Sequence, residues 1–181
     1  MAFPSFASGD VLNASDMNAV GLWLVKTQTI GTGVTTVTVS GAFSSTYDNY
    51  RIVVNIDSIN TGGPYATLQL GSTTTGYYYG MAGAVFSTAA ASLLSTNNGA
   101  NWNRLGPVNT TGSSFVVDLL NPNRALRTVI YSNYADFNTA GSGGNGSGFL
   151  NDTTQYTAFT LGLTTAATMT GGNIRVYGYR N

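Results

Sequence analysis

The stretch "YRIVVNIDSI" at residues 50–59 alternates bulky apolar residues with more polar ones. In an extended chain, successive side chains point to opposite faces, so a repeat of two places every second residue on one face. The apolar face takes four such residues: Tyr50, Ile52, Val54 and Ile56. A repeat of two over ten residues is typical of a half-buried β-strand and excludes an amphipathic helix.

Working outward from this strand, similar short apolar or alternating runs recur between turn signals such as "NTGGP" at 60–64. They predict strands at 23–30, 34–40, 50–59, 65–70, 76–86, 115–120, 126–134, 156–163 and 173–179. Residues 95–114 are expected to be mostly loop, with a short strand around Trp102, and the Gly-rich 140–148 is expected to be a mobile surface loop. Short strands at this spacing predict an all-β fold, an antiparallel β-sandwich of jelly-roll type.

The composition is poor in charge. Only 8% of the residues are charged, against roughly 25% in typical domains, and the formal net charge is zero. Such a chain has no basic field for nucleic acid or for an anionic membrane surface, so neither is an expected partner. A surface of hydroxyls and amides carries little charge repulsion and tolerates close self-association.

The residue inventory excludes most catalytic constellations. The sequence has no His, Cys or Glu, which removes Ser-His-Asp triads, thiol nucleophiles and thiolate metal sites. Asp118 in "VVDLL" is the most suggestive carboxylate, and an ion pair with a nearby strand Arg, or a place on the polar sheet face, is favoured over catalysis. We expect no enzyme activity, no cofactor and no metal site.

Two aromatic features are candidate receptor contacts. In a strand, the neighbouring rings of "YYY" at 77–79 must point to opposite faces, so at least one leaves the core. Trp102, in the polar stretch "NNGANWNRLG" with Arg104, suits stacking on a sugar; the alternative is a Trp that closes the end of the sandwich or lies in an oligomer interface. The candidate contacts are Tyr77, Tyr78, Tyr79, Trp102 and Arg104.

Residues 1–21 form a separate arm ahead of a sandwich domain at 22–181. Within it, "GDVLNASDMNAV" (9–20) predicts two turns of helix capped by Asn13 or Ser15 and ended by Gly21. Two turns are not stable alone in water, so the arm needs a partner: the base of its own sandwich, another subunit, or sister chains. The candidate anchoring residues are Phe6, Val11, Leu12, Met17, Asn18 and Val20. No signal peptide or run of roughly 20 apolar residues is visible, so we expect synthesis in a cytoplasm and no membrane insertion.

The arm motif carries a resemblance. Its "G-[D/E]-V-L-x-A-x-x-[M/L]-N" pattern, here at 9–18, resembles the start of many bacteriophage tail-fibre and minor structural proteins. The stretches at 21–54 and 171–181 look like a β-domain that recurs in phage virion proteins. The resemblance implies a virion protein assembled in the host bacterial cytoplasm, with an arm docked on other virion proteins and a β-sandwich projecting outward, usually as a homotrimer.

Three functions follow as hypotheses. The first is a tail fibre or tail-tip appendage whose outer loops contact the host surface, with a surface glycan as candidate partner. The first alternative is a head fibre or capsid decoration protein with no receptor role. The second is a free carbohydrate-binding module, which would leave the arm without a purpose. A depolymerase-type enzyme is disfavoured by the chain length and by the residue inventory.

Overall fold

The computed structural model describes residues 8–9, 21–137 and 140–179. The predicted arm helix lies outside these residues, and the described part contains strands and no helix. The strands are β1 (Leu22–Thr29), β2 (Thr32–Val34), β3 (Thr36–Val39), β4 (Asn49–Ile59), β5 (Ala66–Leu70), β6 (Tyr77–Val85), β7 (Ala91–Gly99), β8 (Ser113–Leu120), β9 (Val129–Asp136), β10 (Ser142–Leu150), β11 (Phe159–Leu163) and β12 (Met169–Tyr179). The prediction of an all-β antiparallel sandwich is confirmed.

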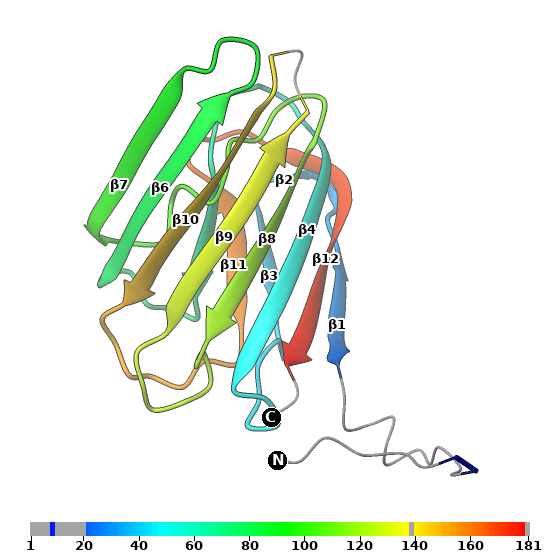
Figure 1. Cartoon of the computed structure of the whole chain (residues 1–181), viewed down its shortest axis with the longest axis vertical. Coiled ribbons are helices and arrows are strands. Elements are labelled where there is room, and N and C mark those ends of the chain that lie inside the picture. Colours follow the sequence, from blue (N-terminus) through cyan, green and yellow to red (C-terminus); the bar gives the residue numbers. More distant parts are fainter. Residues whose placement is uncertain (1–7, 10–20, 138–139, 180–181) are drawn as a thin grey trace.

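Two sheets of unequal size face each other (Figure 1). The large sheet has the order β1-β12-β4-β8-β9-β10-β6-β7, with β2 continuing the line of β1 along β12. The small sheet has the order β3-β11-β5, and residues 101–108 extend it through isolated bridges from Leu68 to Trp102 and from Tyr65 to Pro107. The four positions β1-β12-β4-β8 packed on β3-β11-β5-(101–108) have the strand order of a jelly roll.

The remaining four strands are two hairpins inserted into that jelly roll. The β6–β7 hairpin comes between β5 and the 101–108 segment, and the β9–β10 hairpin comes between β8 and β11. Both add to the same edge of the large sheet, where β10 pairs with β9 on one side and with β6 on the other. We call this four-stranded extension, β9-β10-β6-β7, the inserted lobe.

The stretch at 50–59 becomes β4, the strand at the centre of the jelly-roll half of the large sheet. It pairs with β12 and β8 along nearly its whole length, and its apolar face lies in the core. Tyr50 and Ile52 are fully buried, and Val54 and Ile56 are at most 2% exposed. The alternation in the sequence is therefore the inside–outside alternation of the strand.

The Gly-rich stretch at 140–148 was wrongly predicted as a loop, because most of it is β10. Its inward positions, Gly144, Gly146 and Gly148, lie beneath the tyrosine rings of the neighbouring strands. A Cβ at Gly146 would lie 2.1 Å from the hydroxyl oxygen of Tyr79, and one at Gly144 would lie 2.9 Å from the ring of Tyr134. The glycines are there because the rings of the adjacent strands occupy the volume that side chains of β10 would fill.

The prediction for 95–114 is partly wrong for a related reason. Its first residues belong to β7, an edge strand that carries few apolar residues and ends in "TNNG". The short strand expected around Trp102 is present only as the isolated bridge to Leu68. A polar edge strand buries too little surface to show a repeat of two in the sequence.

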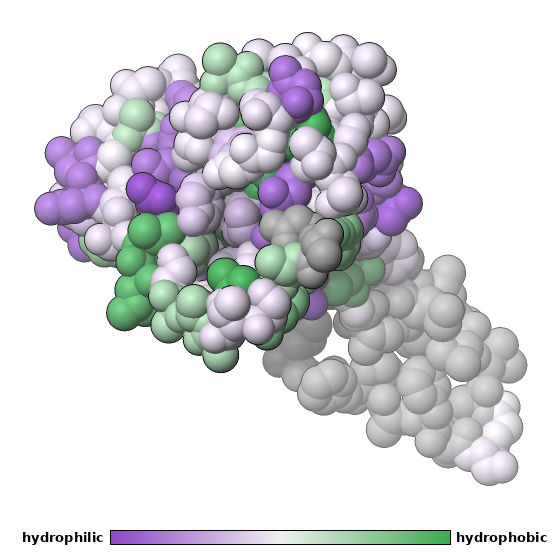
Figure 2. Space-filling view, turned by 90° about the horizontal axis from the view of Figure 1, so that it is seen from above, coloured by the Kyte–Doolittle hydropathy of each residue, from purple (hydrophilic) through white to green (hydrophobic). Residues whose placement is uncertain are grey.

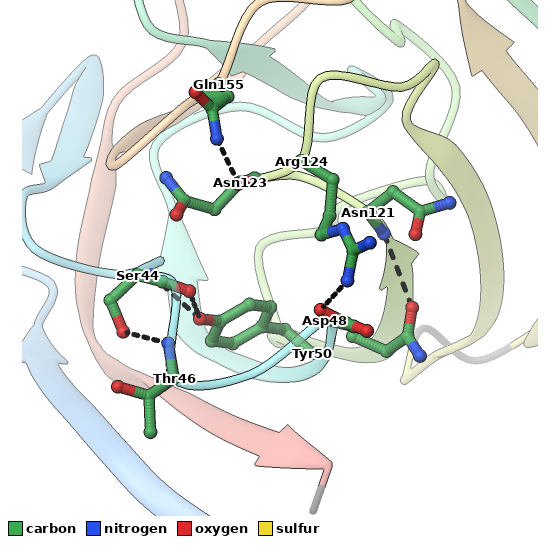
Figure 3. A network of polar contacts seen from close by, with 9 residues as sticks. Ser44, Thr46, Asp48, Tyr50, Asn121, Asn123, Arg124 and Gln155 are labelled. Atoms are coloured by element: carbon green, nitrogen blue, oxygen red, sulfur yellow. Dashed lines mark hydrogen bonds and ion pairs between the residues drawn. The ribbon is translucent and has the colours of Figure 1, made fainter. Parts of the chain in front are cut away.

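At the end of the sandwich where β1 begins and β12 ends, which we call the base, tyrosine hydroxyls fasten the loops that cross between the sheets. Tyr50, near the start of β4, accepts a hydrogen bond from Ser44 N and donates one to Ser44 O, both at 2.8 Å (Figure 3). Tyr77, at the start of β6, bonds in the same way to Leu70 at the end of β5. In both cases the tyrosine lies just after the chain crosses from the small sheet to the large one. Its hydroxyl bonds to the backbone of the residue at which that crossover begins.

Neighbouring base loops are joined by further polar contacts (Figure 3). Arg124 pairs with Asp48, and Gln155 Nε2 donates to the carbonyl oxygen of Asn123 at 3.1 Å. These contacts connect the β3–β4, β8–β9 and β10–β11 loops. The base therefore consists of loops that are joined to one another by hydrogen bonds and an ion pair.

Candidate functional site

The structure separates the predicted aromatic contacts. Tyr77 and Tyr79 point into the core and Tyr78 points outward, as the strand geometry requires. Burial raises the pKa of the Tyr79 hydroxyl to about 12, although a hydrogen bond with Ser132 acts in the opposite direction. The two inward rings are structural, and only Tyr78 remains a surface aromatic.

The expectation of an exposed Trp102 is wrong. The side chain is fully buried and meets the ring of Tyr77 edge to face, with the centroids 5.0 Å apart. Arg104 lies beside Tyr65, with its guanidinium carbon 5.2 Å from the ring centroid. The alternative interpretation, a Trp that closes the sandwich, is the one that the structure supports, because the 101–108 segment carries Trp102 down onto the inserted lobe.

Asp118 lies on the outer face of the large sheet and is paired as the sequence predicted. Arg51, directly opposite on β4, donates from Nε and Nη2 to its two carboxylate oxygens at 2.8 Å each. The Tyr179 hydroxyl donates to Oδ1 at 2.7 Å. Burial acts to raise the pKa of Asp118, but the hydrogen bonds from Arg51 and Tyr179 outweigh it, so the pKa lies below its ordinary value.

A hollow of about 660 Å³ lies on the outer face of the inserted lobe. Its floor is formed by the small outward residues of β10 and β6, among them Ser147, opposite Gly80, and Asn145, opposite Ala82. The walls are the flanking strands, with Tyr131 and Asn133 on β9 and Leu93 and Ser95 on β7. The hollow exists because short side chains in the two middle strands lie between longer ones at the sides.

A second hollow, of about 390 Å³, adjoins the first on the other side of Tyr131. It is lined by Arg127, Val129 and Phe149, and it shares Tyr131 and Ser147 with the first. Phe149 stacks on Tyr78, with centroids 4.8 Å apart and ring planes within 10°. Tyr131 itself is 48% exposed. We call the two hollows together the outer trough.

Sequence reasoning missed this trough because it treated 140–148 as a loop. The sequence does show an alternation that is typical of a strand: glycine stands at 144, 146 and 148, and each is followed by a residue with a side chain, Asn145, Ser147 and Phe149. An alternation of glycine with polar residues was interpreted as flexibility, when it also fits a strand with one crowded face and one open face.

A different surface lies at the base, where β1 begins. Leu22, Trp23 and Leu24 are 42%, 36% and 56% exposed, and β1 is the edge strand of the large sheet. Leu22 is opposite Tyr179, so the first residues of the domain lie beside the end of β12. The predicted anchoring residues, from Phe6 to Val20, lie outside the described residues.

Apolar residues also gather at the opposite end, which we call the tip. Figure 2 views the molecule from this end and shows them over the side where β6 and β7 are joined. Phe86, just after β6, is 65% exposed, and Leu93 on β7 is 81% exposed. Tyr77 begins its strand at the base and Trp102 is in the core, so neither of these predicted receptor contacts lies at the tip.

Over the described ranges, no three His, Cys, Asp or Glu side chains are grouped so that they could hold a metal ion. In the same part of the chain, no helix has the length and hydrophobicity to span a membrane. Comparison with protein-family models, with curated proteins and with solved structures finds no match to this chain.

Proposed function

We propose that the protein is a non-enzymatic structural protein of a bacteriophage virion, a tail fibre or tail-tip appendage that docks through residues 1–21. In this proposal the jelly roll is the projecting body. The inserted lobe, at the far edge of the large sheet from β1, is the part that faces the host surface. The chain associates as a homotrimer, with the arm and the base as its contact region.

The observation that carries the proposal is the apolar start of β1. Leu22, Trp23 and Leu24 directly follow the arm and are all at least 36% exposed. Edge strands of free monomers are usually protected by charges, prolines or bulges, because an open edge pairs with other chains. Here Lys26 and a register shift after Leu24 come only after the apolar residues. The start of β1 is therefore an exposed apolar surface on an open sheet edge, directly after the arm in the sequence, which supports burial against another chain.

The proposal is tested on intact particles. A phage that encodes the protein without residues 2–20 should assemble particles that lack it. A full-length variant with Trp23→Ser and Leu24→Asn should bind particles weakly. A Phe137→Ser variant, altered at an exposed tip residue, is the control and should decorate normally. Full decoration by the deletion variant would refute the docking role.

Location and copy number distinguish the tail from the head. A few copies at one vertex, at the tail, agree with the proposal. Tens to hundreds of copies over the capsid would replace it with the head-fibre alternative. Particles without the protein that adsorb normally to host cells would remove the receptor role.

A further inference from the structure

We propose that the outer trough of the inserted lobe binds a glycan. A pyranose ring stacks on Tyr131, and the side chains of Asn145, Ser147 and Asn133 hydrogen-bond its hydroxyls. The biological role of this site, host attachment, rests on the function proposed above. The binding itself rests only on the geometry of the lobe.

The shape of the trough fits a chain of flat rings. Neighbouring strands lie about 4.8 Å apart, so the three spacings from β9 to β7 make the larger hollow about 14 Å wide from strand axis to strand axis. Tyr131 stands between the two hollows with about half of its surface exposed. A ring that separates two adjoining hollows can contact consecutive units of a chain on its two sides.

The lining suits a polyol. The side chains that project into the larger hollow from the middle strands end in an amide, a hydroxyl or a methyl group, or are absent, and no Asp, Lys or Arg lines it. Amides and hydroxyls both donate and accept, as sugar hydroxyls do. Asp118, opposite Tyr131 on the adjacent strand, is already paired with Arg51. The larger hollow therefore offers hydrogen bonds and an aromatic face without a strong field.

The second hollow adds a charge preference. The guanidinium carbon of Arg127 lies 6.0 Å from the centroid of the Phe149 ring, and within the described residues Arg127 forms no salt bridge. Phe149 and Tyr78 form a stacked aromatic platform beside it. A sugar carboxylate at this end would meet an unpaired cation. We therefore infer that the glycan carries an acidic unit there, next to the unit stacked on Tyr131.

A glycan explains the trough better than another protein chain does. A peptide strand would add to the free edge of β7, away from the floor of the trough. A second copy applied through the same face by a twofold axis would place hollow against hollow and leave a void, which costs packing. A saccharide, which has both apolar ring faces and hydroxyls, fits a concave surface of aromatic rings, amides and hydroxyls that a flat protein face does not fill.

The structure offers a variant that fills the trough without disturbing the fold. A Cβ built at Gly80 would have no heavy atom within 4 Å, so Gly80→Val projects into open space on the floor. Valine also favours a strand more than glycine does. Thr27→Val, on the same face of the sheet but on β1, adds the same side chain far from the trough and is the matched control.

The test uses the full-length protein on an array of neutral and acidic bacterial capsular and O-antigen polysaccharides. We expect binding that Tyr131→Ala and Gly80→Val each weaken at least about tenfold. Thr27→Val should bind as the wild type does. Arg127→Gln should lose acidic polysaccharides while Tyr131→Phe keeps them. Thermal melts establish that each variant is folded.

Three outcomes would overturn the proposal: no polysaccharide is retained, or Gly80→Val and Tyr131→Ala bind like the wild type, or sedimentation shows that these variants dissociate an oligomer. The last would assign the face to a second copy. The role of the site in the virion is tested by a separate measurement on particles. Particles that carry Gly80→Val should keep the protein but adsorb poorly, whereas loss of the protein from particles concerns the docking arm.

Discussion

Removing the hydroxyl of Tyr77 should destabilise the domain far more than the loss of one oxygen atom suggests. Tyr77 is fully buried, and its hydroxyl oxygen accepts a hydrogen bond from Leu70 N at 2.8 Å. The hydroxyl also lies 3.2 Å from the carbonyl oxygen of Thr73. Leu68 N points to the same side of β5 and bonds to Trp102 O, but the 101–108 segment extends no further to serve Leu70. The Tyr77 hydroxyl therefore satisfies the backbone of Leu70, which a further strand beside β5 would otherwise satisfy.

The magnitude follows from what Tyr77→Phe leaves behind. A buried amide N–H without a partner costs about 1–3 kcal/mol, and the lost bond from the hydroxyl adds about 1 kcal/mol. Phenylalanine keeps the ring contact with Trp102, so no cavity is added. We expect a loss of about 2–4 kcal/mol in the free energy of unfolding. For a chain of this size that lowers Tm by about 4–16 °C.

The assay is urea unfolding with calorimetry at one protein concentration, because association would otherwise shift the apparent stability. Tyr78→Phe is the matched control: it is the next residue, it faces outward, and no hydrogen bond of its hydroxyl is seen within the described residues. It should change the free energy of unfolding by less than about 0.5 kcal/mol. Equal stability of the two variants, with unchanged m-values, would refute the idea that the hydroxyl replaces a strand.

Four further substitutions have predicted effects on stability. Asp118→Asn should lower the free energy of unfolding by about 1–2 kcal/mol at neutral pH. Because the pKa of Asp118 is lowered in the folded state, this stabilisation is present above about pH 4 and is lost as the pH falls through the folded pKa. In urea melts, the free energy of unfolding of the variant should therefore fall less steeply at acid pH than that of the wild type. Gly144→Val, whose Cβ would lie 2.3 Å from Ala82 O, should leave little folded protein by circular dichroism, whereas Gly80→Val should melt at or above the wild-type temperature. Trp102→Ala should lower the free energy of unfolding by about 3–5 kcal/mol in the same melts, as a core truncation does.

The sequence predicts those parts of the fold in which burial is one-sided. β4 and β12 carry bulky side chains on one face, so their repeat of two is visible. β4 was predicted to within one residue of its observed bounds, and β12 was predicted over its last seven residues, 173–179. The ion pair of Asp118 was also predictable, since a carboxylate in an apolar run needs a partner and Arg51 lies in a neighbouring predicted strand. Such predictions need only the local pattern and a general rule about buried charge.

The inserted lobe was not predictable in the same way. Between Ser142 and Leu150 the inward positions of β10 are all glycine, so its pattern depends on Tyr79 and Tyr134, which come from other strands. Trp102 shows the converse case, a large ring in a polar stretch that is buried by residues distant in the sequence. In both, the deciding information is which segments become neighbours, and a single sequence does not contain it in a readable form.

Because of the same glycines, the two faces of β10 have different roles in the inserted lobe. On the inner face of β10, the rings of Tyr79 and Tyr134 fill the space above Gly144 and Gly146, so the packing at these positions is complete without a side chain from β10. On the outer face, Asn145 and Ser147 are exposed and are not needed for that packing. Substitutions at these outward positions should therefore change what the trough binds at little cost in stability, since surface changes typically fall within about 0.5 kcal/mol. Such a strand, with one side fixed by its neighbours and the other free, is suited to a surface whose ligand changes while the fold does not.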